Sequence, residues 1–367
     1  MNNPLNEIIG QHKVKTILEK IIDSNRIPHA LLFSGREGVG KEFSALQFAK
    51  SLVLKNQSLN NKDSIINSIN NLQEPYIKYI CALPRGKGEK DHDSPYDKLK
   101  SEELLHIQSE FQRKAKNPYY FIDIPNANNI KINSIREISN FISFSYEGNF
   151  KRVIIISNAH LMKDEAQNAL LKNLEEPPED IIFILTTPFP ELVKETILSR
   201  CWRINFENLK PEDVKHILMK FFSVEESSAD KVAEISLGSI KTALNYLDYD
   251  LEILSEKVIK ILRYCFGKKH HLALNEVEEI TTDKSLFKSV ISLIILWFSY
   301  YNKYRHVQTE IPNEKFKETI QKFTSKYPSL DINKVLITLE DFVFRIDRNI
   351  NTNIIGSNLI VKLSSII

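Results

Sequence analysis

The chain contains 367 residues, of which 42% are hydrophobic and 26% are charged, and its formal net charge at pH 7 is +2. This composition is ordinary for a globular protein with two or three domains, so it excludes a mainly disordered chain. A net charge so close to zero predicts no general attraction to nucleic acid or to a membrane, so any DNA contact must come from a local patch or from backbone N–H groups.

The sequence shows no targeting or membrane-spanning pattern. Its start, MNNPLNEIIG, lacks the basic and then apolar order of a signal peptide, and the best apolar run, residues 290–298, is too short to cross a bilayer. We therefore expect a cytoplasmic protein with no membrane partner.

The three cysteines, Cys81, Cys201 and Cys265, lie far apart in the sequence and form no CxxC pair. This spacing argues against a disulfide framework and against a zinc site. We expect each cysteine to be a small buried hydrophobe.

A glycine-rich turn follows the first apolar run, residues 30–33. It reads GREGVGKE over residues 35–42 and continues into an amphipathic stretch, which is the strand, loop and helix order of a Walker A phosphate-binding loop. In such a loop, backbone N–H groups close around phosphates, and Lys41 would reach the outer phosphates. Glu42 stands where Ser or Thr would coordinate magnesium, and a carboxylate there could still meet a metal but would repel the phosphates. The glycines of the predicted loop are Gly35, Gly38 and Gly40.

Residues 57–116 show no regular pattern. Polar stretches of Asn and Ser lead into the mixed-charge run 84–93, which is typical of a solvated loop. His92 lies between two aspartates, but its resemblance to a metal-ligand cluster is weak. We interpret 57–116 as a variable insertion and expect no metal site.

A second motif follows the β-branched run Val153–Ile156, which has the pattern of a buried parallel strand. Directly after this strand, a P-loop ATPase places an Asp that holds the magnesium shell and a Glu that orients water. Here these positions are Ser157 and Asn158, and neither side chain supplies the required charge. We therefore expect a nucleotide-binding fold that has lost its own hydrolytic chemistry.

The pattern of elements changes twice along the chain. Up to about residue 206, short apolar strands alternate with helical stretches, which predicts a three-layer α/β domain. Helix-start signals at 208–213 open a helical part, in which 207–248 is interpreted as a small bundle and 249–367 as a longer all-helical unit. The expected strands are residues 30–33, 119–124, 153–156 and 181–186. The apolar positions expected on the helix faces of the last unit are Val258, Ile261, Leu262, Leu286, Val290, Leu293 and Trp297.

Residues 196–201 read TILSRC and end in Ser199, Arg200 and Cys201. An Arg at the end of a helix favours the helix dipole by about 0.3–1 kcal/mol, which by itself implies no function. Together with the Walker A loop and the segment NALLKNLEEPP at 168–178, the position of Arg200 is the one where certain oligomeric ATPases present an arginine finger to a neighbour's site.

Taken together, these motifs resemble the AAA+ clamp-loader subunits of bacterial DNA polymerase III, and most closely those of the delta prime type. NALLK followed by LEEPP is highly specific for this family, whereas the P-loop alone is not. The matching segments, in the order of the family, are residues 8–11, 28–30, 35–42, 168–178, 199–201, 238–244, 339–342 and 348–351.

The resemblance implies a fold class and a set of domains. The expected fold is an α/β P-loop AAA+ domain with a parallel sheet in three layers, followed by a small helical lid and an all-α C-terminal collar. The corresponding limits are 1–206, 207–248 and 249–367.

The resemblance also implies a function. The chain would join tau/gamma and delta subunits in a heteropentamer that loads the sliding clamp at primer-template DNA. Arg200 would act in trans on the ATP of a neighbouring subunit, with Ser199 and Cys201 to position it.

The chain's own nucleotide site is expected to be degenerate. It comprises the P-loop residues with Thr186 and Lys241, and Lys241 replaces the family's usual sensor Arg. No cofactor is required, and weak binding of ATP, ADP or only an anion is left open. The four-cysteine zinc module of tau/gamma is missing from this sequence, so we expect no zinc.

Members of this family line a central chamber with helix N-termini that hold template phosphates. The candidate here is the helix opened by Asn133 and Arg136, with Lys131 just before it. We interpret these residues as DNA-binding, with an ordinary capped surface helix as the alternative.

Two other functions stay open. One is a tau/gamma-like motor subunit that hydrolyses ATP with Glu42 as an unusual magnesium ligand, which turnover by the isolated chain would reveal. The other is a non-replicative AAA+ scaffold, which differs in whether the chain co-purifies with tau/gamma and delta.

Overall fold

The structure is a computed structural model that describes residues 3–24, 26–55, 62–144, 150–306, 311, 313–347 and 350–366. The chain forms two compact units. Unit 1 contains Met1–Val224 and Gly238–Lys241, and unit 2 contains Glu225–Leu237 and Thr242–Ile367. The division into three domains at residues 206 and 248 stays a prediction.

Unit 1 is built on a five-stranded parallel sheet with the strand order β2-β3-β4-β1-β5. The three central strands are buried along their whole length, because helices cover both faces, and this explains their nearly uninterrupted apolar sequence. The predicted α/β class with a parallel sheet is confirmed. The strands are β1 (Ala30–Ser34), β2 (Ile77–Ile80), β3 (Arg152–Ile156), β4 (Ile181–Thr187) and β5 (Trp202–Asn205).

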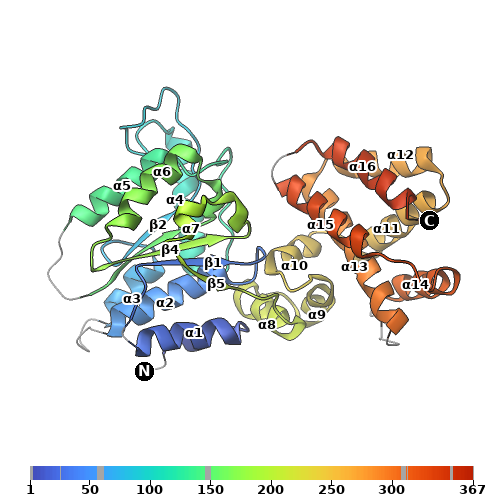
Figure 1. Ribbon diagram of the computed structural model, residues 1–367, viewed down its shortest axis with the longest axis horizontal. Helices are drawn as coiled ribbons and strands as arrows, with labels where there is room; N and C mark the ends of the chain where they lie inside the picture. The colour runs from blue at the N-terminus through green and yellow to red at the C-terminus, as the bar shows by residue number, and fades with distance from the viewer. Residues whose placement is uncertain are drawn as a thin grey trace. The chain divides into compact units, whose positions relative to one another are not determined.

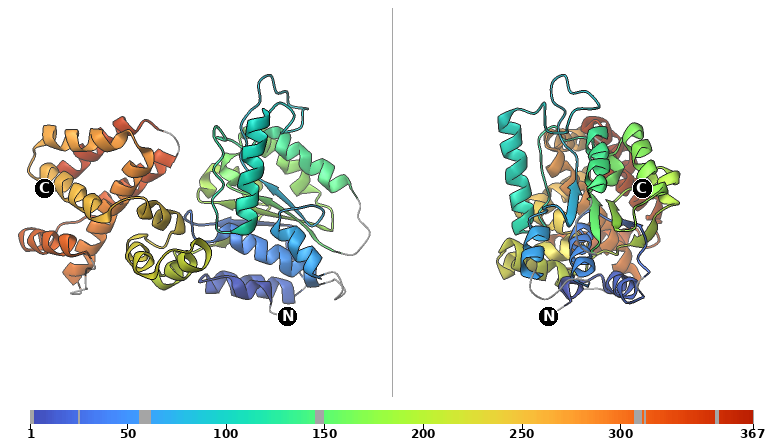
Figure 2. Two further views of the ribbon diagram at one scale, coloured as in Figure 1. Left: turned by 180° about the vertical axis from the view of Figure 1, so that it is seen from behind. Right: turned by 90° about the vertical axis from the view of Figure 1, so that its left-hand side faces the viewer.

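Helices form a layer on each face of this sheet, as Figures 1 and 2 show. α1, α2 and α3 lie on one face, and α5 and α6 pack together on the other. α4 stands beside the β2 edge, where Phe111 of α4 meets Tyr79 of β2 with 5.9 Å between the ring centroids. The described helices of unit 1 are α1 (His12–Asp23), α2 (Lys41–Lys55), α3 (Lys62–Asn70), α4 (Ser101–Lys116), α5 (Ile132–Ser143), α6 (Asp164–Glu175), α7 (Glu195–Leu198) and α8 (Pro211–Phe222), with short 3-10 turns at Pro4–Glu7, Ala159–Leu161 and Pro190–Leu192.

One hydrophobic core of unit 1 lies between the sheet and the layer of α5 and α6. Ile154 and Phe183 of the central strands are fully buried in one cluster with Ile138 of α5 and Leu170 of α6. Burial of each such side chain contributes about 1.5–3 kcal/mol. This core gives a rigid base to the loops that leave the carboxyl ends of β1, β3 and β4.

The predicted strand at residues 119–124 is wrong. A turn covers residues 118–119, and residues 120–124 have no regular secondary structure and lie outside the sheet. Pro118 and Pro125 flank the segment, and proline cannot donate a ladder hydrogen bond. The run is apolar for another reason, because its side chains fill space between other elements; Tyr119 is buried.

The region 57–116, interpreted as a variable insertion, supplies the edge strand β2 and the helices α3 and α4, while its residues 57–61 lie outside the described part of the chain. β2 runs parallel to β3, with Ile77 opposite Val153. A strand of four residues that includes a lysine is too short to show a periodic pattern in the sequence. The other edge strand, β5, is equally short and was also not predicted.

Every regular element among the described residues of unit 2 is a helix, as expected for the C-terminal part of the chain. α10 begins in unit 1 and ends in unit 2. The described helices are α9 (Glu226–Ile235), α10 (Ile240–Leu247), α11 (Leu251–Phe266), α12 (His270–Thr281), α13 (Lys284–His306), α14 (Glu314–Lys326), α15 (Asn333–Asp347) and α16 (Thr352–Ser364).

α13 forms the centre of unit 2. Trp297 is buried, its Nε1 donates a hydrogen bond to Thr319 Oγ1 of α14 at 3.0 Å, and its ring meets that of Phe323 at 5.1 Å. The seven apolar positions predicted for this unit are buried except Leu286, which is half-buried. None of the helices within the described ranges is long and apolar enough to cross a membrane.

The C-terminal segment that resembles the family's collar ending is only partly described. Residues 339–342 lie in α15, and Leu339 and Phe342 are buried. Arg348 and Asn349 lie outside the described residues.

Candidate functional site

The carboxyl ends of β1, β3 and β4 bring the nucleotide-site motifs together at one edge of the sheet. The P-loop connects β1 to α2, Ser157 and Asn158 follow β3, and Thr186 lies near the end of β4. The backbone N–H of Asn158 donates to Thr186 Oγ1 at 3.2 Å, so the ends of β3 and β4 are joined directly. Residues that are far apart in the sequence therefore form one site.

The backbone of the P-loop depends on its glycines. Gly35, Gly38 and Gly40 have φ angles of 141°, 80° and 91°. An added Cβ would lie 2.6 Å from the carbonyl oxygen of Phe206 at Gly35, and 2.6 Å from the backbone nitrogen of Lys241 at Gly38. Only glycine fits these two positions. The turn has the backbone of a phosphate-binding loop, yet neighbouring backbone already crowds it.

Lys41, the predicted phosphate-binding lysine, is turned back onto its own loop. Its Nζ donates to the carbonyl oxygens of Gly35 and Arg36, each at 2.7 Å, and the residue is only 7% exposed. Burial lowers the pKa of Lys41 to about 8, although Glu37 and Glu42 favour its charged form. The ammonium that would meet a phosphate is therefore held by two carbonyl groups.

Glu42, in the position of a magnesium ligand, is the centre of a largely buried polar cluster, in which its own side chain is 23% exposed and that of Lys114 is 2% exposed. Its carboxylate accepts hydrogen bonds from Lys114 Nζ at 2.5 Å, from the Tyr79 hydroxyl at 2.9 Å and from the Ser157 hydroxyl. Burial alone would raise the pKa of Glu42, but the Lys114 ammonium and these hydrogen bonds outweigh it and hold the pKa below its ordinary value. Burial and the nearby Glu42 charge raise the pKa of the Cys81 thiol to about 12.

Lys114 gives Glu42 the positive charge that a bound magnesium ion would give. It lies in the last turn of α4, its side chain is 2% exposed, and its Nζ also donates to the Tyr120 carbonyl oxygen at 2.7 Å. An ammonium only donates hydrogen bonds, whereas a magnesium ion binds water and phosphate oxygens as ligands. The cluster is therefore neutralised from within and does not bridge to a phosphate.

The ring of Tyr119 lies over the P-loop. Its Cε1 is 3.5 Å from the place of an added Cβ at Gly40, and the ring stacks on Phe43 at 4.5 Å and meets Phe221 at 4.9 Å between centroids. The hollow that remains between the P-loop, Lys114 and Tyr119 measures about 50 Å³. Small-molecule pockets typically measure roughly 300–1,000 Å³. In this conformation Lys114 and Tyr119 occupy space beside the P-loop and leave only a small hollow there.

Lys241, predicted as a sensor residue, also reaches the P-loop. Its Nζ lies 2.6 Å from Glu37 Oε1, and the Ser239 hydroxyl donates to the Glu37 carbonyl oxygen at 2.8 Å. The structure therefore brings Lys41, Lys241 and Thr186 to the predicted site, where both lysines contact atoms of the loop.

Arg200 and Ser199 lie apart from this cluster, just after α7. The Arg200 guanidinium donates to Glu175 Oε1 at 2.9 Å and to the Thr196 carbonyl oxygen at 2.8 Å, and Ser199 Oγ donates to the same carbonyl at 3.1 Å. Glu175 belongs to the LEEPP segment, so the two motifs that follow the P-loop meet in space. The Arg200 side chain is 35% exposed and that of Glu175 is 50% exposed. Cys201 is buried, which raises its pKa to about 12.

The residues interpreted as DNA-binding lie at the start of α5 and contact the loop that precedes α4. Asn133 and the side chain of Lys131 are buried and bind Glu89, and the Arg136 guanidinium donates to the Asp91 carbonyl oxygen. Their contact with DNA stays a prediction, and the side chains of Lys131 and Asn133 already have partners within the chain.

No metal centre emerges from the described part of the chain. Within it, no group of three or more His, Cys, Asp and Glu side chains could hold a metal ion. The three cysteines are all buried and unbridged, as expected for small hydrophobes.

Sequence reasoning missed Lys114, Tyr79 and Glu89. Lys114 had a detectable signal, because it shares a face of α4 with buried Ile107 and Glu110 at the spacing i, i+3 and i+7. Charged residues that recur on the buried face of a helix indicate buried ion pairs, since they are rarely buried without a partner. Tyr79 and Glu89 carried no comparable pattern.

Comparison with known proteins identifies the family to which this chain belongs. Residues 10–210 match the family described as DNA polymerase III, delta subunit. The matched residues are more than half of the chain and include the P-loop, Ser157, Asn158 and Arg200.

Individual relatives are similar over different lengths. DNA polymerase III subunit gamma of Buchnera aphidicola subsp. Acyrthosiphon pisum is 26% identical over 89% of this chain and 86% of that protein. DNA polymerase III subunit tau/gamma of Haemophilus influenzae is 30% identical over 66% of this chain but only 30% of that protein. A crystal structure of a DNA polymerase III gamma subunit-related protein from Thermotoga maritima matches at 18% identity over 95% of this chain and 98% of that chain, with a TM-score of 0.36. The chain thus spans most of the Buchnera protein and less than a third of the Haemophilus protein.

Proposed function

The chain belongs to the DNA polymerase III delta subunit family, and from this we propose that it is a delta prime-like subunit of the clamp loader, which helps to load the sliding clamp onto primed DNA. The resemblance to DNA polymerase III clamp-loader AAA+ subunits is confirmed at the level of the family. One contrast within unit 1 supports the finer assignment: the P-loop lysine Lys41 is bound by carbonyl groups of its own loop, whereas the Arg200 side chain is 35% exposed.

The proposed subunit does not hydrolyse ATP. Ser157 and Asn158 provide no carboxylate for the metal shell or the attacking water. Entry of ATP or ADP would require Lys114 and Tyr119 to move, and loss of the Lys114 cation would leave the largely buried Glu42 carboxylate unpaired, which destabilises the fold by up to about 3–5 kcal/mol. We propose that no nucleotide cofactor is required and that ATP or ADP binds weakly at most.

In this proposal Arg200 acts on the ATP of a neighbouring subunit. A guanidinium stabilises the charge that develops on the transferred phosphoryl group. The Glu175 contact holds the Arg200 side chain in one orientation, and a half-exposed pair of this kind contributes only about 0–1 kcal/mol. A phosphate, which forms strong bidentate contacts with arginine, can therefore replace the Glu175 carboxylate.

The partners of this function are tau/gamma and delta subunits, the sliding clamp and, through the assembled complex, primer-template DNA. The place of action is the cytoplasm. The match of residues 10–210 to the DNA polymerase III delta subunit family supports this set of partners.

Substitution of Arg200 in the reconstituted loader tests the proposal. Arg200→Ala and Arg200→Lys are expected to fold and assemble but to slow ATP-driven clamp loading on primed DNA at least about tenfold, since such fingers contribute roughly 10³–10⁵ in rate in other phosphoryl-transfer systems. Lysine fails because it lacks the planar fork. Total ATPase is expected to fall only in part, because only the site that faces this subunit is disabled. Arg203→Ala is the matched control, since Arg203 is also exposed and pairs with Glu195 at 3.4 Å.

Two results would contradict the proposal. Normal loading kinetics in both Arg200 variants would make Arg200 a helix-end cation and the protein a passive scaffold. Steady magnesium-dependent ATP turnover by the isolated chain, lost in Lys41→Ala, would favour the motor alternative.

A further inference from the structure

The mixed-charge run that precedes α4 is folded around a buried carboxylate. We call residues 85–98 the Glu89 loop. The side chains of Glu89 and Lys131 are 3% and 7% exposed, and Lys131 Nζ lies 2.8 Å from Glu89 Oε2. Removal of two charges from water is costly, and such a pair persists only where further hydrogen bonds satisfy it. The expectation of an ordinary solvated loop is therefore wrong for the centre of this segment.

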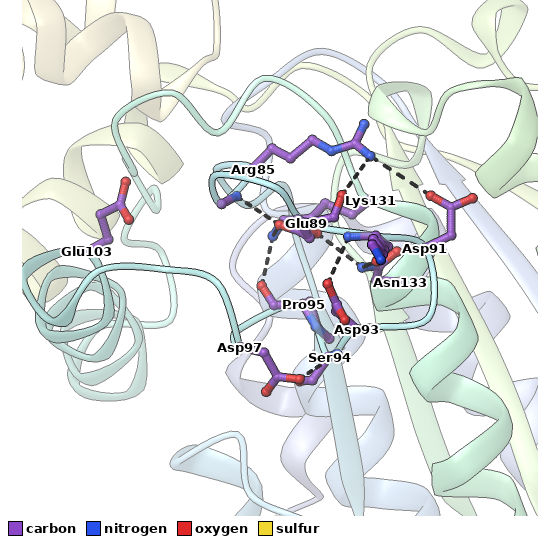
Figure 3. A network of polar contacts seen from close by, with 12 residues as sticks. Arg85, Glu89, Asp91, Asp93, Ser94, Pro95, Asp97, Glu103, Lys131 and Asn133 are labelled. Carbon is purple, nitrogen blue, oxygen red and sulfur yellow. Dashed lines mark hydrogen bonds and ion pairs between the residues drawn. The ribbon is translucent and has the colours of Figure 1, made fainter.

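Figure 3 shows how the loop closes around Glu89. The backbone N–H of Gly86 donates to Glu89 Oε2 at 2.8 Å, and Asn133 Nδ2 donates to Oε1 at 3.1 Å. Lys131 Nζ also donates to the Pro95 carbonyl oxygen at 2.7 Å. Two residues at the start of α5 thus hold the loop at several points along its length.

The loop also uses its aspartates internally. Asp93 Oδ2 accepts a hydrogen bond from the Lys90 backbone N–H at 2.8 Å, and Asp97 Oδ2 accepts one from the Ser94 backbone N–H at 3.0 Å. These contacts fix two turns.

The remaining carboxylate of the loop, Asp91, has cationic neighbours. It lies 3.9 Å from the Arg85 guanidinium and 4.0 Å from that of Arg136. All four carboxylates of the loop therefore have a partner in the chain.

Unlike its carboxylates, the ammonium groups of the loop's lysines have no hydrogen-bond or ion-pair partner among the described residues. Lys87, Lys90 and Lys98 are exposed, and their ammonium groups form no hydrogen bond or ion pair with any residue that the structure describes. Figures 1 and 2 show the loop extending beyond the helical layers of unit 1. The chain is nearly neutral overall, and of the carboxylates of this loop only that of Glu89 is buried; the three aspartates have partners in the chain, while the three lysines are exposed.

We propose that the Glu89 loop is a prefolded contact for the phosphate backbone of nucleic acid, in which Lys87, Lys90 and Lys98 meet phosphates while Lys131 and Asn133 position the loop. The proposal rests on the clamp-loader function and deepens its DNA contact. Lysine contacts with phosphates are independent of base sequence, as loading at any primed site requires. A loop that is folded before binding loses less conformational entropy when it binds.

Charge removal from the loop tests the contact. We compare the full chain with the triple variant Lys87→Ala, Lys90→Ala and Lys98→Ala, and measure fluorescence anisotropy of a labelled primed DNA between about 50 and 200 mM NaCl. The expected result is a roughly tenfold loss of affinity at low salt and a salt slope smaller by about two to three. The control triple variant Lys20→Ala, Lys163→Ala and Lys210→Ala removes the same charge from other exposed positions of unit 1 and is expected to bind as the wild type does.

Three outcomes would overturn the proposal. They are equal losses in both triple variants, no measurable DNA binding by the wild-type chain at low salt, and unchanged DNA affinity in the loop variant. If the last of these came with lost assembly into the loader, the loop would be a contact for an acidic protein instead.

A second variant tests the positioning role. Glu89→Gln removes no cation, so a purely electrostatic role of the lysines predicts no loss of DNA affinity. We expect a loss of affinity together with faster amide exchange at Gly86 and Lys90, whose N–H groups bond to loop carboxylates. Asn133→Ala is a milder change that is also expected to lower DNA affinity and to speed amide exchange. It replaces Glu89→Gln in this test if that variant folds poorly. Faster exchange with full DNA affinity would show that preformation is not needed.

Failure of this inference is separable from failure of the proposed function. The Arg200 variants change ATP-driven loading and leave the DNA affinity of the isolated chain intact. The loop variants change that affinity and leave ATP hydrolysis by the assembled motor without DNA intact.

Discussion

Two charged regions of unit 1 differ in burial. The first, the P-loop cluster, contains Lys41, Glu42 and Lys114, and the second is the pair formed by Arg200 and Glu175. Lys41 and Lys114 are buried and donate to backbone carbonyl groups, and Lys114 also pairs with the Glu42 carboxylate, whose side chain is 23% exposed. The side chains of Arg200 and Glu175, which form an ion pair, are 35% and 50% exposed. The comparison teaches that a motif's residues do not reveal whether its charge is structural or available for chemistry, because burial and partners decide this.

The energetics of the two regions follow from the same difference. A buried pair that loses one partner leaves a desolvated charge, whereas an exposed pair is weak and screened by salt. Substitutions in the P-loop cluster should therefore act on stability, and those at Arg200 on activity.

The largest effect on stability is expected at Lys114. Lys114→Met removes the buried cation that pairs with Glu42 and should lower the free energy of unfolding of unit 1 by up to about 3–5 kcal/mol, measured by urea unfolding. Lys116→Met is the matched control, since Lys116 lies on the same helix and is exposed, and it should change stability by less than about 0.5 kcal/mol. Equal stability of the two variants would mean that the cluster is open to solvent, and the contrast with Arg200 would be lost.

A somewhat smaller effect is expected from the pH dependence at Lys41. Its folded pKa of about 8 lies below the ordinary 10.5, so the unfolded chain binds this proton more tightly, and stability should rise with pH between these values. Relative to Lys41→Met, the wild type should gain roughly 3 kcal/mol across that window.

Urea unfolding at several pH values measures this gain, and the difference between the two proteins removes the contributions of other groups. Lys20→Met, which changes an exposed lysine, should show no such trend. A flat difference between wild type and Lys41→Met would show that Lys41 is solvated and free to meet an anion.

The smallest stability effect is expected at the exposed pair. Arg200→Ala and Glu175→Gln should each change the free energy of unfolding by less than about 1 kcal/mol, even where Arg200→Ala impairs clamp loading. A loss above about 2 kcal/mol in thermal or urea unfolding would make Arg200 a structural residue and would remove the contrast between the two regions.

Prediction from the sequence succeeded where the signal was local. The glycine spacing of 35–40 and the apolar runs that became β1, β3 and β4 identified the P-loop and the central sheet. The helix-start signal before Pro211 coincides with the first residue of α8. Prediction from the sequence failed at residues 119–124, where aromatic residues flanked by prolines have the pattern of a strand. It also failed at the short edge strands β2 and β5.

The sequence by itself determined the fold class, the family motifs and the absence of acids at Ser157 and Asn158, because these depend on residue type and on spacing within a few positions. Only the tertiary structure decided that Lys114 neutralises Glu42, that Lys131 and Asn133 hold Glu89, and that Arg200 rests on Glu175. These polar contacts join segments that are distant along the chain. A lysine in a helix has the same local pattern whether its charge is buried against a carboxylate or faces water, so its role appears only when the partner is in place.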